Sequence, residues 1–71
     1  MPERRFILTD GRASDGDFDA AAVFCFEDSM RAAVKSARSF GEACIFSFIE
    51  GPTQDPNHFE ILDLRFERIV R

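Results

Sequence analysis

Two apolar segments flank a helix-forming stretch in the middle of this chain, and they constrain the fold more than any other feature. The first segment covers 20–26 (AAAVFCF) and the second covers 43–49 (ACIFSFI), and Ser47 is the only polar residue in either. A strand with one solvated face alternates apolar and polar residues, whereas strands that are apolar on both sides are usually covered on both. We therefore expect both faces of the sheet to be covered there, although one helix of about three turns covers only one face.

The stretch between these segments carries consistent helix signals. Asp28 or Ser29 can accept hydrogen bonds from the first unpaired N–H groups. Gly41 stands where a left-handed residue usually ends a helix. Apolar residues recur between these two ends at spacings of three and four, which places them on one helix face: Met30, Ala33, Val34, Ala37 and Phe40. The pattern predicts a helix over 30–40 that packs against a sheet.

The rest of the chain predicts two further strands and two loops. A strand over 6–9 precedes a turn-rich link over 10–19, and a loop over 50–57 with two prolines precedes a last strand over 58–70. In that last strand, apolar residues alternate with charged ones after residue 62, and a change of phase predicts a bulge near 61–62 or local burial on both sides. The expected inward set is Leu62, Leu64 and Phe66.

These elements predict one α+β domain over residues 1–71, in the order ββαββ. We expect a single four-stranded sheet, mixed or antiparallel, with one helix packed on one face. The strand over 43–49 should be central, because it is apolar on both sides. The residue pattern does not indicate which of its two faces meets the helix.

Composition narrows the possible partners. The chain has nine Phe but no Tyr or Trp, so its rings lack the polar group that recognition surfaces often use. A net charge of −4 argues against a dominant phosphate-backbone partner. Two cysteines without a CxxC motif predict reduced thiols. No segment is long enough to span a bilayer and no targeting segment is visible, so we expect a cytoplasmic protein without membrane contact.

The acidic link contains the beginning of a calcium-binding pattern. Asp15, Asp17 and Asp19 form D-x-D-x-D, which opens an EF-hand loop. The sixth position of that loop is Ala20, where the turn needs Gly, and the twelfth is Phe26, where the ion needs Glu. The pattern therefore favours a solvated turn, and we expect no metal site.

No set of residues in the sequence has the spacing expected of a catalytic site. His58 is the only histidine and follows a loop, without a nucleophile or carboxylate at a suitable spacing. Cys25 and Cys44 lie in apolar runs, where burial makes a thiol inert. We expect a protein that is not an enzyme, with no cofactor and no small-molecule substrate.

Three cations lie on the helix face opposite the apolar one: Arg31, Lys35 and Arg38. A solvated helix face is one interpretation of this basic stripe. The other is contact with an anion, either a nucleic-acid backbone or an acidic partner.

The apolar strands carry the main functional hypothesis. An exposed apolar sheet face favours association, so we predict a homodimer or a docking face for another protein. The alternative is that the termini and loops cover this face within one chain. The expected interface consists of Phe24, Phe26, Cys44, Phe46 and Phe48, or the opposite set Val23, Ile45 and Ile49.

The hypothesis is thus a small, non-enzymatic interaction or regulatory module that associates with itself. One alternative is a nucleic-acid-binding module that uses the basic stripe. Another is an acidic inhibitor that occupies the basic groove of a partner. The latter would use Asp10, Asp15, Asp17, Asp19 and Glu27.

Overall fold

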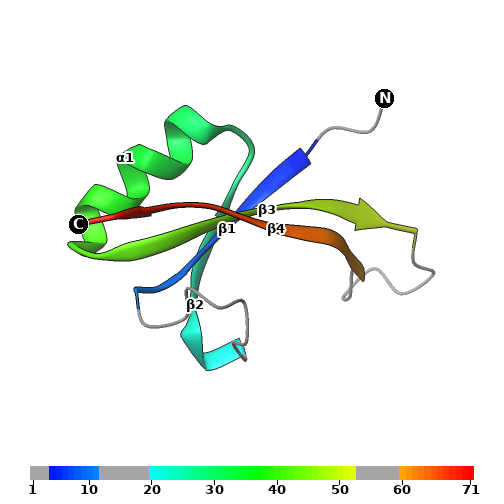
Figure 1. Ribbon diagram of the computed structural model, residues 1–71, viewed down its shortest axis with the longest axis horizontal. Helices are drawn as coiled ribbons and strands as arrows, with labels where there is room; N and C mark the ends of the chain where they lie inside the picture. Colours follow the sequence, from blue (N-terminus) through cyan, green and yellow to red (C-terminus); the bar gives the residue numbers. More distant parts are fainter. Residues whose placement is uncertain (1–3, 12–19, 53–59) are drawn as a thin grey trace.

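The computed structural model describes residues 4–11, 20–52 and 60–71, which form one sheet and one α-helix (Figure 1). A single 3-10 turn precedes the second strand. The elements are β1 (Arg4–Asp10), η1 (Ala20–Ala22), β2 (Val23–Glu27), α1 (Met30–Phe40), β3 (Ala43–Gly51) and β4 (Glu60–Val70). The predicted α+β class and the order ββαββ are confirmed.

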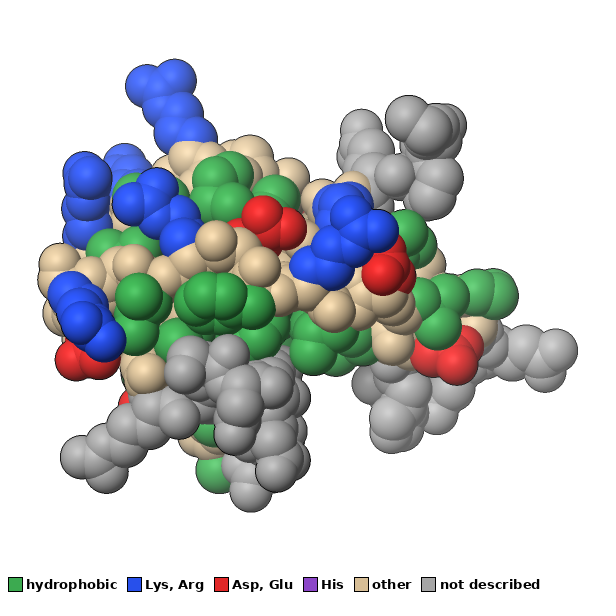
Figure 2. Space-filling model, viewed as in Figure 1, with side chains coloured by type: hydrophobic (Ala, Val, Ile, Leu, Met, Phe, Trp, Pro, Cys, Tyr) green, Lys and Arg blue, Asp and Glu red, His purple; other side chains and the backbone are tan. Residues whose placement is uncertain are grey.

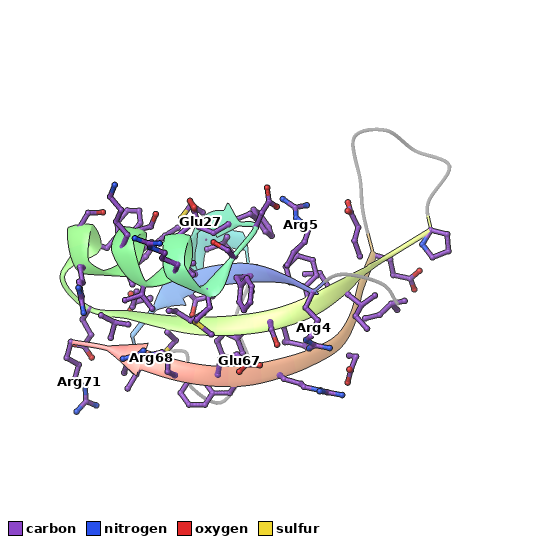
Figure 3. All side chains as sticks on the ribbon, turned by 90° about the horizontal axis from the view of Figure 1, so that it is seen from above. Arg4, Arg5, Glu27, Glu67, Arg68 and Arg71 are labelled. Carbon is purple, nitrogen blue, oxygen red and sulfur yellow. The ribbon has the colours of Figure 1, made fainter. Side chains whose placement is uncertain are left out.

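The four strands form one antiparallel sheet in the order β2-β1-β3-β4. Strand β3 has a neighbour on each side, as predicted, while β2 and β4 form the two edges. Figures 1 and 3 show that α1 lies over one end of β3 and β4, whose other ends extend beyond it. The helix therefore covers only part of one sheet face.

The ends of α1 follow from local hydrogen bonding. Ser29 caps the N-terminus, and its hydroxyl accepts a hydrogen bond from the Ala32 N–H at 3.1 Å. At the other end, Gly41 has φ 91°, a left-handed conformation that a side chain would strain. Its N–H donates to the Arg38 carbonyl at 3.3 Å. The helix spans 30–40, as predicted.

The sheet face below α1 is packed with small and branched residues. Ala33 and Ala37 of the helix are fully buried, and these short side chains let the helix approach the strands closely. The cluster contains Leu8, Ala33, Ala37, Ala43, Ile45 and Val70. The Ala43 and Ile45 side of β3 is therefore the one that meets the helix.

The other sheet face is richer in aromatic rings. Its buried cluster comprises Ile7, Cys44, Phe46 and Phe48. The Phe26 and Phe48 rings meet edge to face with centroids 5.9 Å apart. The six residues over 43–48 are all buried, so β3 is covered on both sides, as its apolar pattern predicts.

Two details of the strand predictions are wrong. Residues 20–22 form a 3-10 turn, so β2 begins only at Val23. Three residues of β4 expected to point inward are instead 38–48% exposed: Leu62, Leu64 and Phe66. Strand β4 is an edge strand, and its pairing with β3 places Leu62 on the helix face, beyond the short helix, and the other two on the opposite face.

Strand β4 contains two bulges. Between the pairs Ser47–Arg65 and Ile49–Leu62, β4 has one residue more than β3, and Asp63 there has φ 51°. A second extra residue, Glu67, follows Phe66. The first bulge confirms the phase change expected near 61–62, and it lies about two residues further along the chain than expected. It also places Ile61 on the same face as Leu64 and Phe66.

Candidate functional site

The residues predicted to form the interface do not make one exposed surface. Cys44, Phe46 and Phe48 are at most 2% exposed in the single chain, and Phe26 is half-buried beside them. Phe24 is 39% exposed but stacks on Phe40 of α1, with ring centroids 4.6 Å apart. It therefore lies on the opposite side of the sheet from the other four.

A bulge in β2 separates Phe24 from its predicted neighbours. Leu8 of β1 lies opposite Cys25 and Thr9 lies opposite Val23, so Phe24 has no partner of its own. Such an extra residue reverses the alternation of faces along the strand. Strict alternation of side chains along β2 had predicted that Phe24 and Phe26 lie on the same face of the sheet.

The exposed apolar side chains gather instead on β4. Ile61, Leu64 and Phe66, here called the β4 apolar patch, share the face opposite the helix and are 38%, 38% and 48% exposed. The Phe66 ring meets Phe46 edge to face at 5.5 Å between centroids. The patch is thus a continuation of the buried Phe cluster towards the solvent. The sequence pattern predicted that Leu64 and Phe66 point inward, so it did not indicate that they form part of the surface.

The charges beside the β4 apolar patch compensate each other. Among the described strand residues on this face, Arg5 and Glu50 are the charged ones, and their side chains approach to 3.7 Å. Arg5 also donates to Asp28 at 3.1 Å and lies 5.8 Å from the centre of the Phe26 ring. The face therefore offers an apolar surface with little net charge.

A polar network links β1, β3 and β4 on the helix side, beyond the end of α1. Arg4 donates to the Ser47 hydroxyl at 2.9 Å, and Ser47 donates to Glu67 at 2.6 Å (Figure 3). Arg4 and Arg65 both pair with the Asp63 carboxylate, at 2.9 and 2.8 Å. The hydrogen bond from Arg4 is the main reason why the pKa of Asp63 lies below its ordinary value, and Arg65 adds to the effect. The network holds the first β4 bulge against its neighbours.

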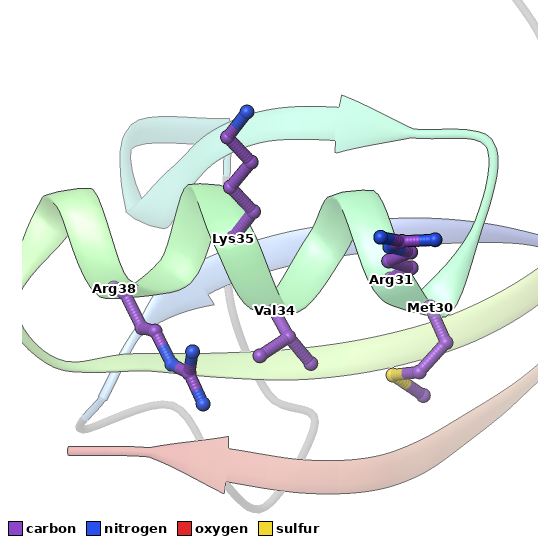
Figure 4. A pocket seen from close by; sticks show the side chains of 5 residues that line it. All are labelled: Met30, Arg31, Val34, Lys35 and Arg38. Atoms are coloured by element: carbon purple, nitrogen blue, oxygen red, sulfur yellow. The ribbon is translucent and has the colours of Figure 1, made fainter.

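The predicted basic stripe borders a hollow on α1. Arg31, Lys35 and Arg38 surround it together with the half-buried Met30 and Val34, and its volume is about 560 Å³ (Figure 4). Figure 2 shows Lys and Arg side chains gathered over the part of the molecule where Figure 1 places α1. We call this feature the basic hollow. It combines an apolar floor with three cations.

The two thiols are in environments that disfavour reactivity. Burial raises the pKa of both Cys25 and Cys44, and nearby carboxylates raise it further. Cys44 is fully buried, and its thiol lies 3.6 Å from the Gly11 carbonyl oxygen. At neutral pH neither sulfur is a thiolate nucleophile.

The other candidate residues are scattered or lie outside the described ranges. Asp10 is exposed at the end of β1, and Glu27 accepts a hydrogen bond from Ser36 at 3.2 Å. His58 and the predicted calcium pattern, Asp15, Asp17 and Asp19, lie outside the described residues. Within the described ranges, no group of three or more His, Cys, Asp and Glu side chains could hold a metal ion.

Two solvent-exposed features stand out in the described part of the chain, the β4 apolar patch and the basic hollow. None of its helices has the length and apolar character needed to cross a membrane. Comparison of the chain with models of protein families, with curated proteins and with solved structures finds no match.

Proposed function

We propose that this protein is a small, non-enzymatic interaction module that forms a homodimer through the β4 apolar patch. The proposal keeps the self-association predicted from the sequence and moves the contact from Phe46 and Phe48 to the adjacent exposed strand. One observation carries it. Three large apolar side chains stand side by side on one face of β4, each more than a third exposed.

The area that a single chain can bury explains why such a patch favours association. A chain of 71 residues is near the size at which one hydrophobic core is barely sufficient. Covering apolar surface is favourable, and the part of this gain that exceeds the entropic cost of association stabilises a complex. The patch also continues directly into the buried Phe46 ring, so a partner would extend an existing core.

A second copy of this chain suits the patch because the nearby charges cancel. In a two-fold dimer the same surface faces itself, so any net charge there would repel its own copy. On this face, Arg5 lies 3.7 Å from Glu50 and 3.1 Å from Asp28, so the charge left over is small. Two such surfaces can therefore meet with little like-charge repulsion.

The test is the solution mass of the full chain, measured by light scattering after size exclusion over a dilution series. We expect a mass near twice 8.1 kDa for the natural sequence. Phe66→Lys should give a folded monomer, because it places a charge within the proposed contact. The 48% exposure of Phe66 lets the lysine reach solvent in the isolated chain, and circular dichroism would verify its fold.

Phe40→Lys is the matched control. Phe40 is 47% exposed, like Phe66, but lies on α1 and stacks on Phe24. We expect this variant to retain the dimer mass. A natural sequence that is monomeric at every concentration would disprove the proposal. A dimer that is lost with Phe40→Lys and kept with Phe66→Lys would move the contact to the Phe24–Phe40 pair.

A further inference from the structure

The basic residues of the described chain divide into two groups. Arg4, Arg5, Arg65 and Arg71 each pair with a carboxylate. Within those same ranges, the other four have no ion-pair partner: Arg31, Lys35, Arg38 and Arg68. Three of these four border the basic hollow. Among the described residues, the positive charge without an ion-pair partner is thus concentrated around α1.

The sequence of α1 keeps these charges uncompensated. The eleven residues of α1, MRAAVKSARSF, include three cations and no acidic side chain. Arg31 and Lys35 are four residues apart, a spacing at which like charges destabilise a helix by a few tenths of a kcal/mol. Arg68 adds a fourth cation on the helix side of β4, opposite Ile45. The arrangement costs stability in the free protein, and a bound anion would remove that cost.

Because the basic hollow has an apolar floor, it suits a ligand that carries an apolar group as well as negative charge. Val34 is half-buried and lies between Arg31 and Arg38, and Met30, which is also half-buried, lies one helical turn before it (Figure 4). An apolar side chain placed there would gain contact area, and methionine adapts its shape to varied ligands. A suitable ligand therefore carries carboxylates on both sides of an apolar group.

The same geometry disfavours a nucleic acid. Among the residues that the structure describes, no aromatic side chain borders the hollow, so none of these residues offers a ring on which a base could stack. Arg31 to Arg38 spans about 10 Å along the helix, which matches a short ligand. A long polyanion would extend beyond the cations over a chain with a net charge of −4, whereas a short one stays within about one Debye length of them.

From these observations we propose that the basic hollow of α1 binds a short acidic peptide segment with a bulky apolar side chain. The carboxylates pair with Arg31 and Arg38 on either side, and the apolar side chain packs on Met30 and Val34. Arginine is suited to this role because its guanidinium forms two parallel hydrogen bonds with a carboxylate. The site is independent of the proposed dimer contact, which lies on the other sheet face.

Fluorescence anisotropy can test this proposal with a short rhodamine-labelled peptide in which glutamates flank a Leu-Phe pair. We expect saturable binding to the full chain, weaker when the glutamates become glutamines or when the Leu-Phe pair becomes Gly-Ser. Arg38→Gln should weaken binding about fivefold, the upper range for a partly exposed ion pair. The matched control is Arg71→Gln, since Arg71 is also exposed but lies 3.8 Å from Glu42. It should leave the affinity unchanged.

The variant Val34→Ala distinguishes the contribution of the apolar floor to peptide binding from that of the charges. It should weaken binding of the Leu-Phe peptide and leave binding of the Gly-Ser peptide unchanged, whereas a partly unfolded variant would lose both. Three results would overturn the proposal: no saturable peptide binding, equal losses with Arg38→Gln and Arg71→Gln, or tighter binding of single-stranded DNA that Arg38→Gln weakens. The last result would identify a phosphate-backbone site.

Discussion

Strands β3 and β4 pair along most of their lengths and have similar apolar content, but they differ sharply in burial. Six consecutive residues of β3 are buried, whereas the first nine residues of β4 are not. Neighbours on both sides cover β3, while β4 lies at the edge and only its last residues approach α1. The position of a strand in the sheet, more than its composition, therefore decides whether its side chains form core or surface.

The largest expected difference between the two strands lies in the cost of removing a ring. Phe48→Ala should lower the free energy of unfolding by about 3–5 kcal/mol, because it leaves a cavity in a fully buried cluster. Phe66→Ala should cost roughly 1 kcal/mol, since nearly half of that ring is already exposed. Urea denaturation at a protein concentration low enough for the chain to be monomeric would measure both.

A domain of this length is stable by only about 4–10 kcal/mol, so Phe48→Ala could be largely unfolded. Phe48→Leu provides a milder version of the same comparison. Equal losses at Phe48 and Phe66 would contradict the difference in burial between the strands.

A smaller effect on the free energy of unfolding is expected for Ser47, whose side chain joins the two strands. Ser47 of β3 is 1% exposed and bridges Arg4 and Glu67 through two hydrogen bonds. Ser47→Ala should lower the free energy of unfolding by about 1–2 kcal/mol, because it removes the bridge from β3 to β4. Ser39→Ala, at an exposed position on α1, is the control and should change stability by less. An unchanged unfolding midpoint for Ser47→Ala would show that the network does not hold β4.

The smallest expected effect on stability concerns the Asp63 carboxylate, which anchors the first β4 bulge. The pKa of Asp63 is lower in the folded chain than in the unfolded one, because Arg4 and Arg65 favour its ionised form. Its contribution to stability is therefore present above the ordinary pKa of about 3.9 and is lost as the pH falls through the folded value.

Thermal unfolding measured from about pH 6 to about pH 2.5 would detect this contribution. We expect Asp63→Asn to lose stability less steeply than the natural sequence at the acid end. The difference should be small, because the Asp63 side chain is 44% exposed and solvent screens its ion pairs. Two curves that fall in parallel would contradict the assignment.

Local signals predicted α1 correctly, and non-local features explain the errors. The helix begins after Ser29 and ends before Gly41 because each cap acts on its own backbone. The face occupied by Phe24 depends on a bulge opposite β1, and alternation alone does not show it. The exposure of Leu64 and Phe66 depends on strand order, which the sequence left open. The basic stripe was visible as helix spacing, whereas its floor of Met30 and Val34 required the fold.

The two bulges of β4 have a consequence for how far assembly can proceed. An edge strand of eleven residues presents free N–H and C=O groups on which further chains could pair without limit. The bulges at Asp63 and Glu67 divide that edge into short pieces, and charged side chains lie beside each one. Both features disfavour the pairing of further chains along this edge. In the proposed dimer, contact through the β4 apolar patch would be closed by the second copy and would leave no further copy of that patch exposed.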